Sequence, residues 1–225
     1  MLSELAPDLF TEAIPHAMLG LQFGARMDVV RLPDGGLVVY SPLPLEPQRQ
    51  ASVAQLGPVQ AIVAPNLMHH LYAGDWKAAF PEAQLYGAEG LEKKRKDLRF
   101  DGLLRPGAPA PWGGEALSLH AFAGHDRMRE CALVHRPSGT LLCCDLVSNM
   151  PDSGHWVTSL YQGLMGFRGK PAFSRLLRTT FTDRPAARRS LEALLEEPFQ
   201  RVVMAHGEVI GENGPEILRE VHGWL

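Results

Sequence analysis

Four apolar runs in this chain of 225 residues each end near a histidine or an aspartate. Short apolar runs bounded by turn residues are typical of strands that are buried on both faces. The runs occupy residues 59–64, 119–124, 141–144 and 202–205. The polar residues that follow them are His69, His70, His125, Asp145 and His206. Because strand ends carry the functional side chains of many α/β proteins, this pattern predicts an α/β fold with one clustered site.

The remaining segments fit strands that alternate with helices. Residues 27–40 are predicted to form a hairpin, because Gly35 and Gly36 tolerate the positive φ of its turn. Asp183 is a predicted helix N-cap, with Pro185 in the first turn. Further strands are predicted near 84–86, 116–123, 130–136 and 200–205. Helices are predicted near 46–56, 75–80, 89–96, 183–195 and 214–222, and a loop over 98–114. This order predicts an α/β sandwich in a single domain, residues 1–225.

Composition narrows the class of protein. With 45% hydrophobic and 21% charged residues, the chain has the composition of an ordinary soluble globular protein. The net charge of −3 gives no reason to expect nucleic acid as a partner. No apolar segment approaches the roughly 18 residues of a membrane span, and no export signal is visible, so we expect a cytoplasmic protein. The adjacent Cys143 and Cys144 should point to opposite faces of a strand as buried apolar groups rather than form a disulfide.

Histidines are only modestly enriched, at nine in 225 residues, so their positions matter more than their number. Five are interpreted as solvated or core residues: His16, His120, His135, His155 and His222. The other four each follow a β-like run and lie beside a glycine or a chain break. Together with the carboxylate of Asp145, these imidazoles suit zinc, with iron or manganese as alternatives. Taken alone, the pair His69 and His70 could simply belong to a turn.

The order of these landmarks resembles that of the metallo-β-lactamase superfamily. Its members have a β-hairpin, a strand leading to a His-x-His-x-Asp-His loop, a Gly-His, a strand ending in Gly-Asp and a strand ending in Gly-His-Gly. This chain has the hairpin at 27–40 and the loop Pro65-Asn66-Leu67-Met68-His69-His70. Its later landmarks are Gly124-His125, Cys144-Asp145 and Ala205-His206-Gly207. The resemblance covers about residues 27–207 and implies a four-layer αββα sandwich.

The metal loop departs from the family pattern at its first two histidines. Pro65 and Leu67 occupy these positions and cannot coordinate a metal through their side chains. Asn66 lies between them and is at best a weak ligand. His69 stands where the family has aspartate, and His70 where it has the following histidine. The chain thus resembles a divergent branch of the superfamily with a Pro-Asn-x-x-His-His loop.

The resemblance implies one metal ion rather than two. The first site of the family keeps only His125, whereas the second keeps four donors, namely His69, His70, Asp145 and His206. The implied activity is metal-dependent hydrolysis, in which an activated water attacks an ester, thioester, lactone or phosphoester bond of a small-molecule substrate. His125 and Asp145 are the candidate catalytic residues, and His125 is a fifth ligand or a hydrogen-bond donor to the reacting groups. Asp126 either orients a ligand imidazole or is an ordinary exposed acid.

A non-catalytic protein is the alternative function. The loss of two loop histidines would suit a degenerate member that binds a small ligand or keeps the metal for stability. Redox chemistry at a di-iron site is disfavoured, since too few donors remain for two metals. The segment 147–182 follows Asp145 and is expected to cover the site as a lid, with a packing insertion or a homodimer contact as the alternatives. Ser41 is expected to support the metal loop, and the basic run 93–96 to be a solvated face.

Overall fold

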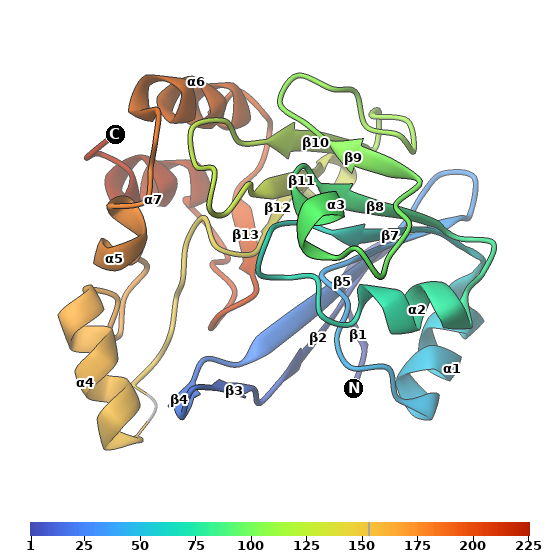
Figure 1. Ribbon diagram of the computed structural model, residues 1–225, viewed down its shortest axis with the longest axis horizontal. Coiled ribbons are helices and arrows are strands. Elements are labelled where there is room, and N and C mark those ends of the chain that lie inside the picture. The colour runs from blue at the N-terminus through green and yellow to red at the C-terminus, as the bar shows by residue number, and fades with distance from the viewer. Residues whose placement is uncertain (153) are drawn as a thin grey trace.

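Two main β-sheets form the centre of the computed structural model, which describes residues 1–152 and 154–225 (Figure 1). The larger sheet has the strand order β1-β2-β5-β6-β7-β8-β9, and the smaller has the order β10-β11-β12-β13. The strands of the larger sheet are β1 (Ser3–Ala6), β2 (Leu9–Ile14), β5 (Ala25–Arg31), β6 (Leu37–Tyr40), β7 (Val59–Ala64), β8 (Gln84–Ala88) and β9 (Gly102–Leu104). Those of the smaller sheet are β10 (Leu117–Ala121), β11 (Cys131–His135), β12 (Thr140–Cys143) and β13 (Arg201–Met204). A small separate hairpin consists of β3 (Ala17–Met18) and β4 (Leu21–Gln22).

The larger sheet changes from antiparallel to parallel pairing at β6. β5 and β6 form the predicted hairpin, in which Val30 pairs with Val38. From β6 onward the neighbouring strands β7, β8 and β9 are parallel, since each connection passes through a helix. These helices are α1 (Pro47–Leu56), α2 (Ala73–Ala79) and α3 (Leu91–Lys94). The apolar run 59–64 is therefore an interior parallel strand, which explains why polar residues are nearly absent from it.

Alternating residues of the smaller sheet face two different cores. Cys144, just after β12, faces the core between the sheets, whereas Cys143 faces the core under α6 (Arg184–Leu195) and α7 (Gly214–Val221). Both thiols are free and buried, as predicted. Helices α1 and α2 cover one outer side of the molecule, and α6 and α7 cover the opposite side (Figure 1). The predicted four-layer αββα sandwich is therefore confirmed.

The N-cap residue Asp183 and the following Pro185 predicted the start of α6 correctly. The side chain of Asp183 accepts a hydrogen bond from the backbone N–H of Ala186 at 2.9 Å, which caps the helix as predicted. The last helix and the strands near 116–123, 130–136 and 200–205 are also present, within one or two residues of their predicted ends. Within the described residues, no helix is long and apolar enough to cross a membrane.

Other elements had no clear signal in the sequence. The strands β1 to β4 precede the predicted hairpin, and β9 lies inside the segment 98–114 that was predicted to be loop. β9 has only three residues and lies at a sheet edge, where proline and glycine on either side are tolerated. The segment 147–182 contains the helices α4 (Trp156–Met165) and α5 (Arg175–Arg178). In Figure 1 these two helices extend from the side of the sandwich.

Candidate metal centre

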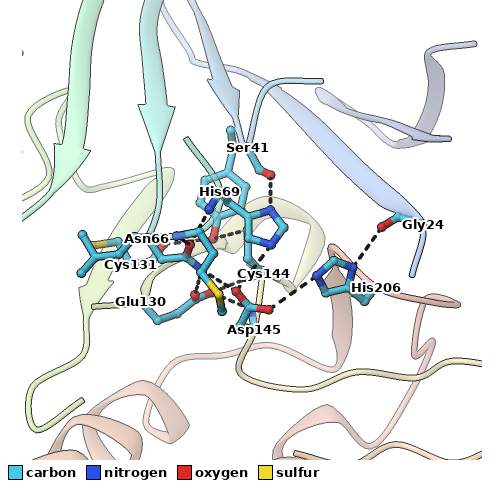
Figure 2. Close-up of polar contacts among 12 residues, drawn as sticks. Gly24, Ser41, Asn66, His69, Glu130, Cys131, Cys144, Asp145 and His206 are labelled. Carbon is cyan, nitrogen blue, oxygen red and sulfur yellow. Dashed lines mark hydrogen bonds and ion pairs between the residues drawn. The ribbon is translucent and has the colours of Figure 1, made fainter. Parts of the chain in front are cut away.

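Three of the predicted donors meet where strands of the two sheets end (Figure 2). His69 follows β7, Asp145 follows β12 and His206 follows β13. One ligand atom from each of these side chains lies within 4.8 Å of the other two. The Asp145 carboxylate lies between the imidazoles, with Oδ2 3.4 Å from Nε2 of His69 and Oδ1 3.5 Å from Nε2 of His206. The structure thus brings together three of the five predicted donors.

Both imidazoles are held through their other ring nitrogen. Nδ1 of His206 donates to the carbonyl oxygen of Gly24 at 3.1 Å, because a carbonyl can only accept. Nδ1 of His69 lies 3.2 Å from the hydroxyl of Ser41, the residue expected to support this loop. These contacts leave Nε2 of each ring directed at Asp145 (Figure 2). Partners on the far nitrogen are the usual way in which proteins orient a metal-binding histidine.

Two of the three side chains, Asp145 and His69, are in the protonation state that suits cation binding. Burial works against ionisation of Asp145, but the neighbouring His69 and His206 outweigh it and lower the pKa of the carboxyl to about 2. Burial lowers the pKa of His69 to about 4, so that ring is neutral near pH 7. Burial also opposes protonation of His206, but its hydrogen bond to Asp145 raises the pKa of that ring. A neutral imidazole and an ionised carboxylate are the forms that bind a divalent metal.

A buried amide supports the carboxylate from behind. Nδ2 of Asn66 donates to Oδ2 of Asp145 at 2.7 Å and to Oε2 of Glu130 at 2.6 Å. Oδ1 of Asn66 accepts from the backbone N–H groups of Met68 and His69 at 2.8 and 2.7 Å. Asn66 is fully buried and all these contacts lie within the protein, so it is a hydrogen-bonding bridge rather than the weak ligand considered from the sequence.

Glu130 is the residue of this network that the sequence did not indicate. Its Oε1 accepts from the backbone N–H groups of Cys144 and Asp145, the latter at 3.2 Å. Burial, together with the charge of Asp145, raises the pKa of Glu130 to about 8. Its sequence position directly before the apolar run of β11 is a weak signal, since acids commonly flank strands.

The structure does not bring His70 into the three-residue cluster. The ring is buried, and its Nδ1 lies 3.2 Å from a guanidinium nitrogen of Arg95, which also donates to the His70 carbonyl at 2.9 Å. Burial, with the charges of Lys94 and Arg95, lowers the pKa of His70 to about 4. His70 lines the same cavity as the cluster but is fixed to a different part of the chain.

His125 is likewise separate from the cluster. Its Nε2 is hydrogen-bonded to the hydroxyl of Thr180, and its ring stacks on Phe181 with the centroids 4.0 Å apart. Burial lowers the pKa of His125 to about 4. The neighbouring Asp126 pairs with Arg129 at 2.6 Å and accepts from Thr182 at 2.8 Å. His125 and Asp126 therefore tie the loop after β10 to the chain that leads into α6.

Comparison with known proteins places the chain in a family. Its residues 12–189 match the family described as "Domain of unknown function (DUF4336)". The chain belongs to this family. No curated protein matches this DUF4336 member significantly.

Several solved structures similar to this DUF4336 protein are metallo-β-lactamases. One from Pontibacter korlensis has a TM-score of 0.67 and 12% identity, with 99% of this chain and 98% of that one covered. The mono-zinc form of FIM-1 from Pseudomonas aeruginosa has a TM-score of 0.67 and 12% identity, with 100% and 95% covered. One from Hirschia baltica has a TM-score of 0.63 and 14% identity, with 99% and 96% covered. At these identities the likeness shows the fold, which confirms the resemblance seen in the sequence at that level.

A cavity of about 230 Å³ opens onto the three-residue cluster of the DUF4336 protein. Its wall includes His69, Asp145 and His206 together with Ser41 and, unexpectedly, His16. The segment 147–182 adds Ser148, Met150, Tyr161, Phe167, Ser174, Leu176 and Leu177. These residues therefore form part of the cavity wall, and the role of the segment as a lid stays a prediction.

Proposed function

We propose that this protein is a hydrolase that uses one zinc ion, held by His69, Asp145 and His206. The observation that carries the proposal is the convergence of these three donors on one point of a cavity wall. Two zinc ligands at about 2.1 Å on tetrahedral angles lie about 3.4 Å apart. The nitrogen–oxygen separations of 3.4 and 3.5 Å match that spacing. Three protein ligands leave a position open, which is the arrangement of catalytic rather than structural zinc.

The residues of the chain have distinct roles in this proposal. A bound zinc ion lowers the pKa of coordinated water to about 7 and polarises a carbonyl oxygen. Asp145 supplies the negative charge, with its position fixed by Asn66. Ser41 holds the ring of His69 so that its Nε2 faces the cavity. Iron and manganese accept the same donors and are the alternatives to zinc.

His70 and His125 remain predicted additional ligands, and His125 a predicted catalytic residue. Ligation by His125 through Nε2 would require exchange of its hydrogen bond to Thr180. The contact of His70 with Arg95 occupies only Nδ1, so its Nε2 remains the candidate donor atom. We propose that the three-residue cluster suffices for metal binding and that His125 positions the segment near Thr180.

Metal analysis of protein purified without a histidine tag tests this proposal. We expect about one equivalent of zinc in the wild type and less than about a tenth in His206→Ala, because two remaining donors bind zinc weakly. His125→Ala is the matched control and should keep its zinc. A wild type that takes up no transition metal on reconstitution would overturn the proposal. Loss of zinc in His125→Ala would instead support the wider set of ligands.

A binding or structural protein without turnover is the second candidate function. It is favoured by the contacts that Asp145 already makes with two imidazoles and the Asn66 amide, which satisfy its carboxylate within the chain. It is also favoured by Pro65 and Leu67 at positions where the resembled family has histidines. Ester or phosphodiester turnover that is lost in Asp145→Asn would exclude this candidate.

A further inference from the structure

Cationic side chains are missing from the cavity wall in the part of the chain that the structure describes. The polar groups there are histidines, serines, the Tyr72 and Tyr161 hydroxyls and the carboxylate of Asp145. The other lining residues are apolar and include Phe23, Leu43, Met150, Phe167 and Leu177. Sites that bind phosphate or carboxylate groups normally place Arg or Lys against them. The wall therefore favours an uncharged ligand.

Three arginines that contact a lining residue or adjoin one in sequence are already engaged elsewhere. Arg95 pairs with Asp97 at 2.7 Å, in addition to its contacts with His70. Arg168, in the segment 147–182, forms an ion pair with Asp152. Arg175 donates to the backbone carbonyl of Leu164 at 3.5 Å, which directs it toward the end of α4. An anionic substrate would thus find no free guanidinium among these three.

The rim of the cavity is apolar and exposed. Four residues that line the cavity are also large exposed hydrophobic side chains: Met18, Met68, Leu71 and Leu176. They come from three separate parts of the chain, namely the β3–β4 hairpin, the metal loop and α5. The volume of about 230 Å³ is just below the range of about 300–1,000 Å³ that drug-sized ligands occupy. A short apolar group would fill the interior, and a longer one would extend over this rim.

We infer that the substrate of this cavity is an uncharged carboxylic ester or lactone with an apolar acyl chain, and not a phosphoester. The inference rests on the proposed hydrolase function and names its substrate class. Overall, one water is consumed and the bond between the acyl carbon and the alcohol oxygen breaks, which releases an acid and an alcohol from an ester or a single hydroxy acid from a lactone. The acyl chain lies against Phe23, Phe167 and Leu177, and its far end meets Met18 and Leu176 at the rim.

Chain length in p-nitrophenyl esters is the first test, made on the zinc-loaded protein. Each methylene that is fully buried can raise kcat/KM by about fourfold, the factor equivalent to about 0.8 kcal/mol. From acetate to hexanoate we expect a rise of at least tenfold. An ester of similar length with a distal carboxylate, mono-p-nitrophenyl adipate, should be at least tenfold poorer than the hexanoate. Bis(p-nitrophenyl) phosphate should be hydrolysed no faster than by zinc in buffer.

Two leucines of equal exposure give a matched pair of variants. Leu176 is 54% exposed and lines the cavity, whereas Leu160 is 56% exposed and does not. Leu176→Gln should lower the ratio of hexanoate to acetate kcat/KM at least threefold. Leu160→Gln should leave both values unchanged. A flat chain-length profile, or an adipate ester as good as the hexanoate, would overturn the inference and leave the hydrolase proposal intact.

Binding of 2-octanone, measured by calorimetry, does not depend on turnover. We expect saturable binding that Leu176→Gln weakens and Leu160→Gln does not. If the ketone binds in this way but no ester is hydrolysed, the preference for neutral apolar ligands stands and the hydrolase proposal fails. If neither binding nor turnover is found, both the inference and the hydrolase proposal fail.

Discussion

The bridge formed by Asn66 should be among the most sensitive positions of the protein. Asn66→Ala removes the donor shared by Asp145 and Glu130 and leaves the N–H groups of Met68 and His69 without their acceptor. A hydrogen bond to a charged group contributes about 1.5–3 kcal/mol, and each buried polar group left unpaired costs about 1–3 kcal/mol. We expect the free energy of unfolding to fall by about 3–6 kcal/mol, a large share of the roughly 5–15 kcal/mol of a typical domain.

Urea unfolding of metal-free protein at pH 7 measures this loss, because bound metal would add its own stabilisation. Asn149→Ala is the control. Nδ2 of Asn149 donates to the carbonyl of Glu208 at 3.0 Å on the surface, so its removal should cost less than about 1 kcal/mol. A loss in Asn66→Ala as small as that in the control would refute the claim that the bridge holds the carboxyl groups of Asp145 and Glu130.

A second substitution separates the donor role of Asn66 from its packing. Asn66→Asp keeps the shape and the accepting oxygen but directs a new carboxyl oxygen at Asp145 and Glu130. Like charges at this distance raise the pKa of the new carboxyl in the folded state. A raised pKa means stability that is present at low pH and lost as pH rises through it. The stability difference from the wild type should therefore shrink between pH 7 and pH 5, whereas that of Asn66→Ala should change less.

Two further predictions concern backbone geometry and pH. Gly207 has φ of +102°, and a Cβ there would overlap the carbonyl of Asn149. Gly207→Ala should therefore lower the free energy of unfolding in urea by at least about 2 kcal/mol and displace the neighbouring His206. Gly211→Ala, where a Cβ meets nothing within 4 Å, should be nearly neutral. Burial lowers the pKa of His222 from 6.5 to about 4, so this ring stabilises the fold above pH 6.5 and the contribution is lost as pH falls toward 4. His222→Gln should reduce the slope of stability against pH in that window by up to about 1.4 kcal/mol per pH unit, and an unchanged slope would contradict the assignment.

Strand ends were the most predictable part of this protein. β7, β12 and β13 are buried on both faces, so nearly all of their consecutive residues are apolar, which is a pattern visible in the sequence. The donors His69, Asp145 and His206 could be placed because they follow those strands. β2 was missed although it pairs with β5 over six residues. Its sequence, Leu9–Ile14, mixes buried Thr11 and Glu12 with apolar residues, so no alternation marks it as a strand.

The residues that hydrogen-bond to the site were less predictable than the candidate metal ligands themselves. Gly24 and Glu130 contact the site through pairings between residues far apart in sequence, 182 positions apart for Gly24 and His206. Nothing local distinguishes Gly24 from other glycines, because its role depends on where its carbonyl lies after folding. Nothing local indicated the partners of His125 either, because its ring stacks on Phe181, which lies far along the chain.

The different environments of His69 and His70 follow from the turn that Asn66 makes. Its side-chain oxygen accepts from the N–H of His69, which fixes the backbone at that residue with Nε2 toward Asp145. The next residue along a tight turn points in a different direction, and Nδ1 of His70 accordingly meets Arg95. A loop with histidines two positions apart could present both from one side of an extended segment, whereas adjacent ones in a turn diverge. The turn at Asn66 therefore directs His69, and not His70, at Asp145, which agrees with the proposal of a single metal ion.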